Sequence, residues 1–355
     1  MTTQLRQTGP GAGVGAPDAV PRRALFRKRA FGMVGILIAL ALALLASLAF
    51  GANPLSLGEV WRGFWAPDDS EASVIVWTLR VPRTVVGILV GAAYGVAGAL
   101  IQALTRNPLA DPGILGVNAG AGFAVTIGVG LFGLSGVSGY LWFAFAGAAA
   151  ATVAVYLIGT AGRGTASPVT LVLAGVALAA VLGGFSTFLT LIDPETFRSI
   201  RSWGLGSIAR TGIEDAMTVA PFLAAGLVIA LLLSGSLNSI ALGDDLAASL
   251  GTKVGRTRVF GILSVTLLAG GATAVTGGIG FVGLMIPHIV RWLVGPDQRW
   301  IIAYSALAAP VLVLTADVLG RVLGRPGEIE VGIVTAVLGA PVLIALVRRR
   351  KASGL

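Results

Sequence analysis

The sequence of 355 residues contains no cysteine, a single histidine and little charge. The absence of cysteine excludes a disulfide framework, an iron–sulfur cluster and a thiolate zinc site, and a single histidine excludes a histidine-rich metal site. Charged residues make up 12% of the chain, whereas a soluble globular protein carries about 25%. So few charges could not cover the apolar surface of the chain in water, so its solvent must be lipid.

Long apolar segments are what the sequence has instead. Hydrophobic residues account for 55% of the chain and the mean hydropathy is +0.90. A bilayer core of about 30 Å requires roughly 20 apolar residues per spanning helix. This length predicts an all-α polytopic membrane protein with about ten transmembrane helices, near residues 31–50, 84–104, 114–134, 139–161, 169–192, 216–233, 259–275, 281–294, 301–318 and 331–347. The boundary between the seventh and eighth is the least defined, because Gly277, Gly278 and Gly280 join them.

The 51 glycines are spread through the apolar segments rather than gathered into a low-complexity region. Gly87, Gly91 and Gly95 form two consecutive G-x-x-x-G steps in the second predicted helix. Membrane helices use small residues at this spacing for close packing. The second helix is therefore predicted to lie inside the bundle.

The two ends of the chain are basic. Residues 1–30 are predicted to be a disordered cytoplasmic tail, residues 31–347 the transmembrane domain, and residues 348–355 a cytoplasmic C-terminus. Residues 46–49 (ASLA) faintly resemble a signal-peptidase site, but the preceding apolar run is too long for a signal peptide, which favours an uncleaved helix. The tail, the alternate loops and the C-terminus hold 17 of the 25 lysines and arginines and only 5 of the 16 acidic residues. Both termini are therefore predicted to face the cytoplasm.

The sequence offers no visible energy source. None of the three lysines, Lys28, Lys253 and Lys351, follows the glycine that a phosphate-binding P-loop requires, so we expect no ATP site and no other cofactor in this chain. Ion-driven carriers bury carboxylates near the midplane of the membrane. Only Asp317, near the end of the ninth predicted helix, is an acidic residue within a span. The chain is therefore expected to take its energy from a partner.

The longest internal cytoplasmic loop, residues 234–258, contains a short predicted helix. Leucines recur every four residues and form one apolar stripe, two aspartates occupy the first turn, and a glycine suits the position after the last turn. These residues are Leu242, Leu246 and Leu250, Asp244 and Asp245, and Gly251. The pattern is compatible with a docking element for a cytosolic partner and equally with a helix that lies on the bilayer surface.

Arginines on the opposite side run against the positive-inside trend. Arg80 and Arg83 flank Pro82 at the start of the second predicted helix, and Arg321 and Arg325 follow the ninth. Cations at a helix N-terminus also oppose the helix dipole. Two explanations remain open, which are snorkelling to lipid headgroups and a basic rim that receives an acidic partner. The net charge of +9 does not indicate nucleic-acid binding, because the basic residues lie at the ends of apolar segments.

Two further motifs have structural explanations. Asn107, Pro108, Asp111 and Pro112 are predicted to end one helix and start the next through a rigid turn. The second motif contains Pro287, His288 and Arg291. The lone histidine is expected to be a hydrogen-bonded packing residue, and Arg291 is expected to reach the cytoplasmic interface.

Six segments, taken together and in this order, resemble the permease subunit of the iron–siderophore and cobalamin family of ATP-binding-cassette importers. They are 79–83 (LRVPR), 107–116 (NPLADPGILG), 242–251 (LGDDLAASLG), 280–291 (GFVGLMIPHIVR), 316–321 (ADVLGR) and 326–341 (PGEIEVGIVTAVLGAP). The resemblance covers about 260 residues.

The resemblance implies a ten-helix permease in the cell membrane that pairs with a second copy or a paralogue around a central pathway. Helices two to five and seven to ten would be inverted repeats. Two ATPases, which bind the ATP, would dock on Gly243–Gly251, and an extracytoplasmic solute-binding protein would place glutamates against Arg80, Arg83 and Arg321.

The expected solute is a ferric siderophore, with cobalamin or haem as the alternative. A stand-alone carrier or a membrane enzyme is the alternative of a different class. The absence of midplane carboxylates disfavours a carrier, and the near-absence of cysteine and histidine disfavours most enzyme chemistry.

Overall fold

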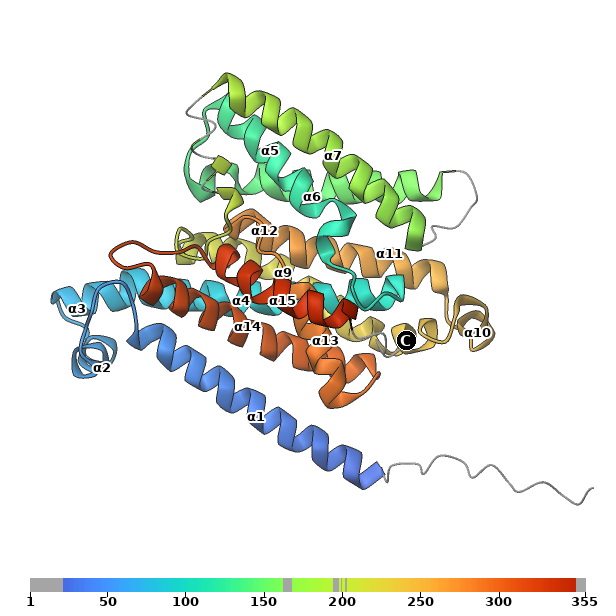
Figure 1. The fold of residues 1–355 in the computed structure, drawn as a ribbon, viewed down its shortest axis with the longest axis horizontal. Coiled ribbons are helices and arrows are strands. Elements are labelled where there is room, and N and C mark those ends of the chain that lie inside the picture. Colours follow the sequence, from blue (N-terminus) through green and yellow to red (C-terminus); the bar gives the residue numbers. More distant parts are fainter. Residues whose placement is uncertain (1–21, 162–167, 194–197, 199, 202, 349–355) are drawn as a thin grey trace, which may run out of the picture.

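The computed structural model describes residues 22–161, 168–193, 198, 200, 201 and 203–348, and these residues form a bundle of helices (Figure 1). In chain order the helices are α1 (Arg22–Ala49), α2 (Leu57–Trp65), α3 (Glu71–Val74), η1 (Ile75–Arg80), α4 (Val81–Thr105), η2 (Pro112–Leu115), α5 (Val117–Phe132), α6 (Gly136–Thr160), α7 (Pro168–Ile192), α9 (Ile213–Ile240), α10 (Asp244–Ser249), α11 (Val254–Val265), η3 (Thr266–Gly270), α12 (Gly271–Thr276), α13 (Val282–Val294), α14 (Gln298–Leu323) and α15 (Val331–Arg348).

Seven helical segments of the described chain are long and apolar enough to cross a membrane, which confirms a multi-pass membrane protein. They are Arg27–Ala49, Glu71–Thr105, Gly136–Gly159, Val169–Ile192, Ile213–Ile240, Val254–Thr276 and Gln298–Leu323. Shorter apolar helices, α5, α13 and α15, occupy the other three predicted positions. The 13 residues of α13 rise only about 20 Å, so its first turn starts inside the bundle, where irregular backbone is tolerated because protein surrounds it.

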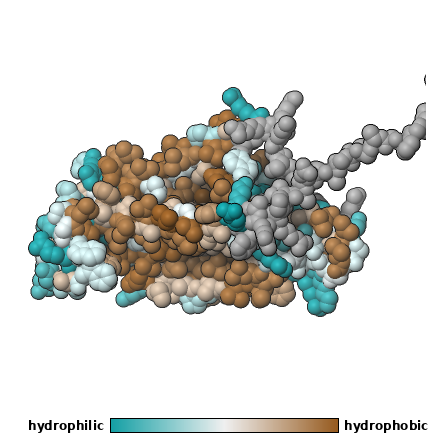
Figure 2. All heavy atoms as spheres, turned by 90° about the horizontal axis from the view of Figure 1, so that it is seen from below, coloured by the Kyte–Doolittle hydropathy of each residue, from teal (hydrophilic) through white to brown (hydrophobic). Residues whose placement is uncertain are grey.

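The polar ends of the molecule lie on opposite sides of an apolar belt. Helices α2 and α3 and the loop before α15 form one end, and α10 and the N-terminal end of α1 form the other (Figure 1). Brown, hydrophobic residues cover the middle of the face seen in Figure 2, between hydrophilic residues at both ends. The belt runs across the long helices, as expected for a chain that lies in a bilayer.

One predicted boundary changes at the N-terminal end, and one predicted junction is found where it was expected. Helix α1 begins at Arg22, so the last part of the predicted tail is helical, while residues 1–21 lie outside the described part of the chain. The predicted glycine junction between the seventh and eighth spans is confirmed. The backbone between α12 and α13 is left-handed at Gly277 (φ 72°) and at Phe281 (φ 68°).

The second predicted span begins before Arg80, not at it. Helices α3, η1 and α4 are continuous from Glu71 to Thr105, so Arg80 and Arg83 do not lie at a helix N-terminus, and the predicted conflict with the dipole is absent. The first turn instead carries Glu71, behind the N-cap Ser70. The π-helical turn η1 accommodates Pro82, which has no N–H for the regular helical ladder.

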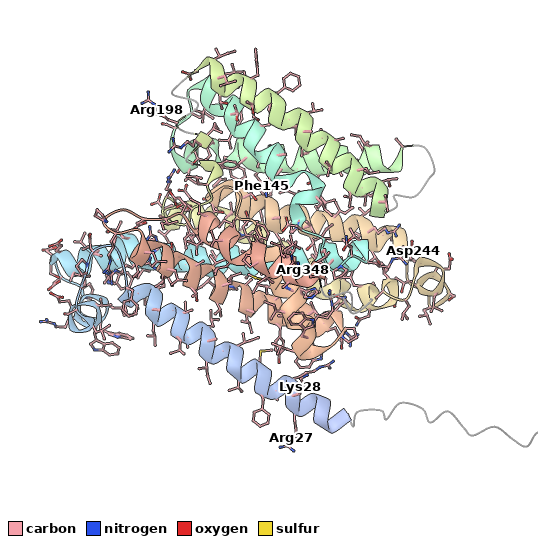
Figure 3. The ribbon with its side chains drawn as sticks, in the orientation of Figure 1. Arg27, Lys28, Phe145, Arg198, Asp244 and Arg348 are labelled. Atoms are coloured by element: carbon pink, nitrogen blue, oxygen red, sulfur yellow. The ribbon has the colours of Figure 1, made fainter. Side chains whose placement is uncertain are left out.

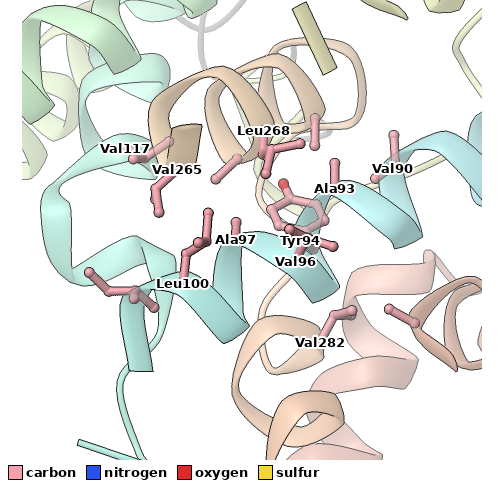
Figure 4. Packing of buried hydrophobic residues seen from close by; sticks show 14 of the residues in the cluster. Val90, Ala93, Tyr94, Val96, Ala97, Leu100, Val117, Val265, Leu268 and Val282 are labelled. Carbon is pink, nitrogen blue, oxygen red and sulfur yellow. The ribbon is translucent and has the colours of Figure 1, made fainter. Parts of the chain in front are cut away.

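Helix α4 lies at the centre of the bundle, as its glycines predict. Its side chains pack against α5, η3 and α13 in the buried core (Figure 4). On the side toward α14, a Cβ atom at Gly91 would lie only 2.6 Å from the Cα atom of Pro310, and one at Gly95 would lie 2.5 Å from the Cβ atom of Ala309. A Cβ atom at Gly98 would lie 1.9 Å from the carbonyl oxygen of Gly283 on α13. These helices therefore touch backbone to backbone.

Replacing Gly91 by leucine should separate α4 from α14, because the new side chain overlaps the backbone of Pro310. Overpacking of this kind costs about 1–3 kcal/mol or more. We expect a lower midpoint of thermal unfolding in detergent than for the wild type. Gly35→Leu is the matched control, because nothing lies within 4 Å of a Cβ atom at Gly35. Equal midpoints for the two variants would contradict the central position of α4.

Candidate functional site

A cavity of about 390 Å³ opens at the end of the molecule that carries α2 and α3. The end of α1, the start of α4, the residues before α9 and the end of α14 contribute its walls. The charged residues that line it are Arg80, Arg83, Arg210, Arg321 and Glu328. The cavity thus collects the arginines of the predicted rim, together with a further arginine and a glutamate.

Arg80 and Arg321, two of the three arginines predicted to receive an acidic partner, are buried, with exposed fractions of 3% and 2%. Both arginines donate to the last carbonyls of α1. Arg80 Nη1 lies 2.6 Å from the Leu48 oxygen and 2.8 Å from the Ala49 oxygen, and Arg321 Nη1 lies 2.8 Å from the Phe50 oxygen. These carbonyls have no partner within α1, and the negative end of the helix dipole favours cations there.

Arg83 is the member of the predicted set that remains available in the cavity. Its guanidinium nitrogens Nη1 and Nη2 donate to the two carboxylate oxygens of Glu328, at 3.2 Å and 2.6 Å. Its Nε atom lies 3.9 Å from Asp317, which is paired at 2.9 Å with Arg321 one turn further along α14. Arg83 and Arg321 are therefore joined through Asp317 and Glu328 in one network.

Sequence reasoning missed Arg210, Glu328 and Glu330. Arg210 pairs with Glu330 at 2.6 Å, and Glu330 directly precedes α15. The alternation in Gly327-Glu-Ile-Glu was the available signal, because two carboxylates two residues apart point to the same side of an extended segment.

The opposite end carries α10, which is shorter than the predicted stripe: Leu246 lies in the helix, Leu250 caps it, and Leu242 precedes it, before Gly243. Leu242, Leu246 and Leu250 have exposed fractions of 60%, 49% and 61%. Gly243 precedes the helix with a φ of 108°, and Gly251 follows it with a φ of 84°. The predicted glycine at the end of the helix is part of a Schellman motif, because the Gly251 N–H donates to Ala248 and the Thr252 N–H to Ala247.

The two aspartates of α10 lie in its first turn, as predicted. Asp244 connects α10 to the rest of the bundle and is labelled at the right-hand end of the molecule in Figure 3. It pairs with Arg258 of α11 at 2.7 Å and lies 3.8 Å from Arg106, which follows α4. Asp245 is exposed. The leucine stripe is therefore presented by a helix that is fixed to α11 and to the end of α4.

The turn between α4 and α5 is ordered by its own side chains. Asn107 Oδ1 accepts from the N–H of Leu109 at 2.9 Å, and Asp111 Oδ1 accepts from the N–H of Gly113 at 2.8 Å. Pro112 then begins η2. Burial raises the pKa of the Asp111 carboxyl, and the bond from Gly113 opposes this effect. This geometry agrees with the predicted rigid turn.

His288 and Arg291 lie inside the bundle. His288 has an exposed fraction of 4% and stands edge-on to Trp292, with 5.0 Å between ring centroids. It is a packing residue, as expected, in a helix that also contains Pro287. Arg291, in the last turn of α13, is 9% exposed, and its Nη2 atom lies 3.3 Å from Gln102 Oε1 of α4.

Metal ligands are not grouped in the part of the chain that the structure describes, where no cluster of three or more His, Cys, Asp or Glu side chains could hold an ion. The two ends instead present surfaces, an arginine-lined cavity at one and a leucine stripe at the other.

Three relatives match most of this chain. The ferric enterobactin transport system permease protein FepD of Escherichia coli (strain K12) is 49% identical and aligns over 92% of this chain and 97% of its own length. The Fe(3+)-citrate import system permease protein YfmD of Bacillus subtilis (strain 168) is 41% identical, over 85% and 90%. The hemin transport system permease protein HmuU of Yersinia pestis is 34% identical, over 89% and 96%.

A solved structure has the same fold. It is an inward-facing conformation of a metal-chelate type ABC transporter, with a TM-score of 0.78 and 28% identity, and the match covers 93% of this chain and all of the other. The model of the FecCD transport family matches residues 39–349. The chain therefore belongs to the FecCD transport family.

Proposed function

We propose that this chain forms the translocation pathway for a ferric siderophore in an ATP-driven importer. The observation that carries the proposal is the relative of 49% identity, a permease for ferric enterobactin, which aligns over nearly the whole of both chains. The citrate relative also transports an iron chelate, by its name. Haem is the second candidate, because the hemin permease aligns over a similar length at 34% identity.

Ten spans with both termini in the cytoplasm are the proposed topology. The three shorter apolar helices bring the seven long spans to ten. Helices α5 and α13 support inverted repeats, because each is the short second helix of its repeat. Arg27, Lys28 and Asp244 lie at one end of the molecule and Arg198 at the other (Figure 3). The positive-inside rule assigns the first end, with its excess of lysine and arginine, to the cytoplasm.

Energy would come from two cytosolic ATPases that dock on the leucine stripe of α10. The exposed leucines support this site, since the cytoplasmic position of α10 places them where a soluble partner can bury them. Asp317, the sole acidic residue within the predicted spans, is held by Arg321, so it is not free to carry ions across the membrane. An extracytoplasmic solute-binding protein would dock at the opposite end, and a second copy or a paralogue would complete the pathway.

Transport of the iron chelate tests the proposed substrate. Liposomes that contain this permease, its ATPase and its solute-binding protein should accumulate ⁵⁵Fe-labelled ferric enterobactin. ATP is enclosed in the lumen, so that it drives the permeases whose ATPase faces the lumen. Ferric citrate, haem and cobalamin, supplied at the same concentration, are the comparison solutes. Accumulation of haem or cobalamin in preference to every ferric siderophore tested would replace the proposed substrate.

Replacing Leu246 by aspartate tests the ATPase site. The charge would be buried unpaired in an apolar contact, at a cost of several kcal/mol, about 2–7 by transfer data for unpaired polar groups. The variant should insert into the membrane normally and lose the ATPase on detergent pull-down. Ala248→Asp is the control, because Ala248 is exposed on the same helix but lies off the stripe. Full recovery of the ATPase with Leu246→Asp would refute the assignment.

Replacing Arg83 by glutamine tests the solute-binding protein site. The substitution removes the available cation of the cavity without adding a third carboxylate beside Asp317 and Glu328. Binding of the loaded solute-binding protein should weaken by roughly tenfold at low salt, mainly through a slower association rate. Arg62→Gln removes an exposed cation at the same end but outside the cavity, and should bind normally. Unchanged binding by Arg83→Gln would disprove docking at the cavity.

A further inference from the structure

The outward cluster contains more cations than anions. Five arginines and three carboxylates are joined by the cavity and by the ion pairs that surround it, namely Arg80, Arg83, Arg210, Arg321 and Arg325, and Asp317, Glu328 and Glu330. Arg80 and Arg325 donate to backbone carbonyls only, among the contacts given for them. Two positive charges are therefore left without carboxylates, and two further carboxylates would balance the cluster.

Three ion pairs of this cluster, Arg321 with Asp317, Arg83 with Glu328 and Arg210 with Glu330, differ in their exposure to water. The side chains of Arg321 and Asp317 are 2% and 7% exposed. Glu328 is 35% exposed and its partner Arg83 is 11% exposed, and Arg210 is 43% exposed and its partner Glu330 is 19% exposed. The buried pair is fixed by the cost of separating its charges. The other two are open at the cavity, where an incoming carboxylate can compete for the arginine.

Both open pairs hold the start of α15. Glu328 and Glu330 lie immediately before Val331, the first residue of that helix. At the second residue of the helix, the N–H of Gly332 donates to the carbonyl oxygen of Gly206 at 3.0 Å. Further along, Gly339 packs so closely on Phe281 that a Cβ atom there would lie 2.4 Å from the ring. Phe281 is the N-cap of α13, so the middle of α15 and the broken span are in direct contact.

We propose that Glu328 and Glu330 occupy, within this chain, the positions that acidic side chains of the solute-binding protein take when it docks. Carboxylates of the partner enter the cavity and bind Arg83 and Arg210. The two glutamates are then released, and with them the start of α15. This inference rests on the proposed docking of an acidic partner at the cavity, and it adds Arg210 to the docking residues and an internal competitor to the site.

Competition within one chain has a definite sign. A tethered carboxylate is present at a high effective concentration, so it lowers the apparent affinity of an external carboxylate for the same arginine. The apparent affinity equals the intrinsic affinity multiplied by the fraction of molecules in which the internal pair is open. Removing the internal charge should therefore strengthen partner binding, whereas removing a carboxylate that contacts the partner directly would weaken it.

The test uses the double variant Glu328→Gln/Glu330→Gln in the complete chain, reconstituted with its ATPase. Binding of the loaded solute-binding protein should strengthen by roughly fivefold or more at low salt. Amide hydrogen exchange should accelerate at residues 329–334 even without the partner, since both pairs that hold this segment are lost. Glu71→Gln/Glu214→Gln removes two acidic residues at the same end but outside the cluster, and should change neither quantity.

The outcomes separate this inference from the docking on which it rests. If Arg83→Gln weakens binding but the double variant neither binds more tightly nor exchanges faster, docking stands and the internal competition is refuted. If the double variant binds more weakly, the glutamates contact the partner themselves, and the proposal is again overturned. If Arg83→Gln has no effect on binding, docking at the cavity fails. Exchange at residues 329–334 then still reports whether the two pairs hold α15.

Discussion

Backbone contact between α4 and its neighbours is the constraint on which the other helices depend. In a bilayer there is no hydrophobic force between helices, because lipid tails are as apolar as leucine, so association relies on close packing. Glycine at residues 91, 95 and 98 lets α14 and α13 approach the backbone of α4. Once α14 is seated against α4, the positions of Arg83, Asp317 and Arg321 relative to one another are determined, since Arg83 belongs to α4 and the other two belong to α14.

The buried arginines show how a membrane protein completes the end of a helix. The carbonyls at the end of α1 have no partner within the helix, and Arg80 and Arg321 supply the missing donors. A guanidinium suits this place, because it carries five donors and is always charged. The departure from the positive-inside trend therefore has a structural cause for these two residues, and neither lipid headgroups nor a partner is needed to explain it.

Much of the fold could be predicted from the sequence, because span length and glycine spacing are local properties. The ten apolar segments, the central position of α4 and the capped helix α10 all depend on residues close together in the chain. The burial of Arg80 and Arg321 depends on where α1 ends, which is more than 30 residues away from the first of them and more than 270 from the second. Arg291 similarly meets Gln102 across the bundle.

The same limit applies to the candidate site. The leucine stripe is a pattern within one short segment, and its exposure followed from the spacing. The pairing of Arg83 with Glu328 spans 245 positions, and no local signal relates the two residues. Glu328 and Glu330 lie in a segment that supported the family resemblance, but without the fold their charges had no visible partner.

The two glycine-bounded ends of α10 have a mechanical consequence. A helix that frays absorbs a displacement by unwinding, whereas the Schellman motif at Gly251 and the pairing of Asp244 with Arg258 leave little slack. A displacement of α10 is therefore passed to α11 through the pair of Asp244 and Arg258. In the proposed importer, an ATPase that binds α10 and displaces it would therefore also displace α11.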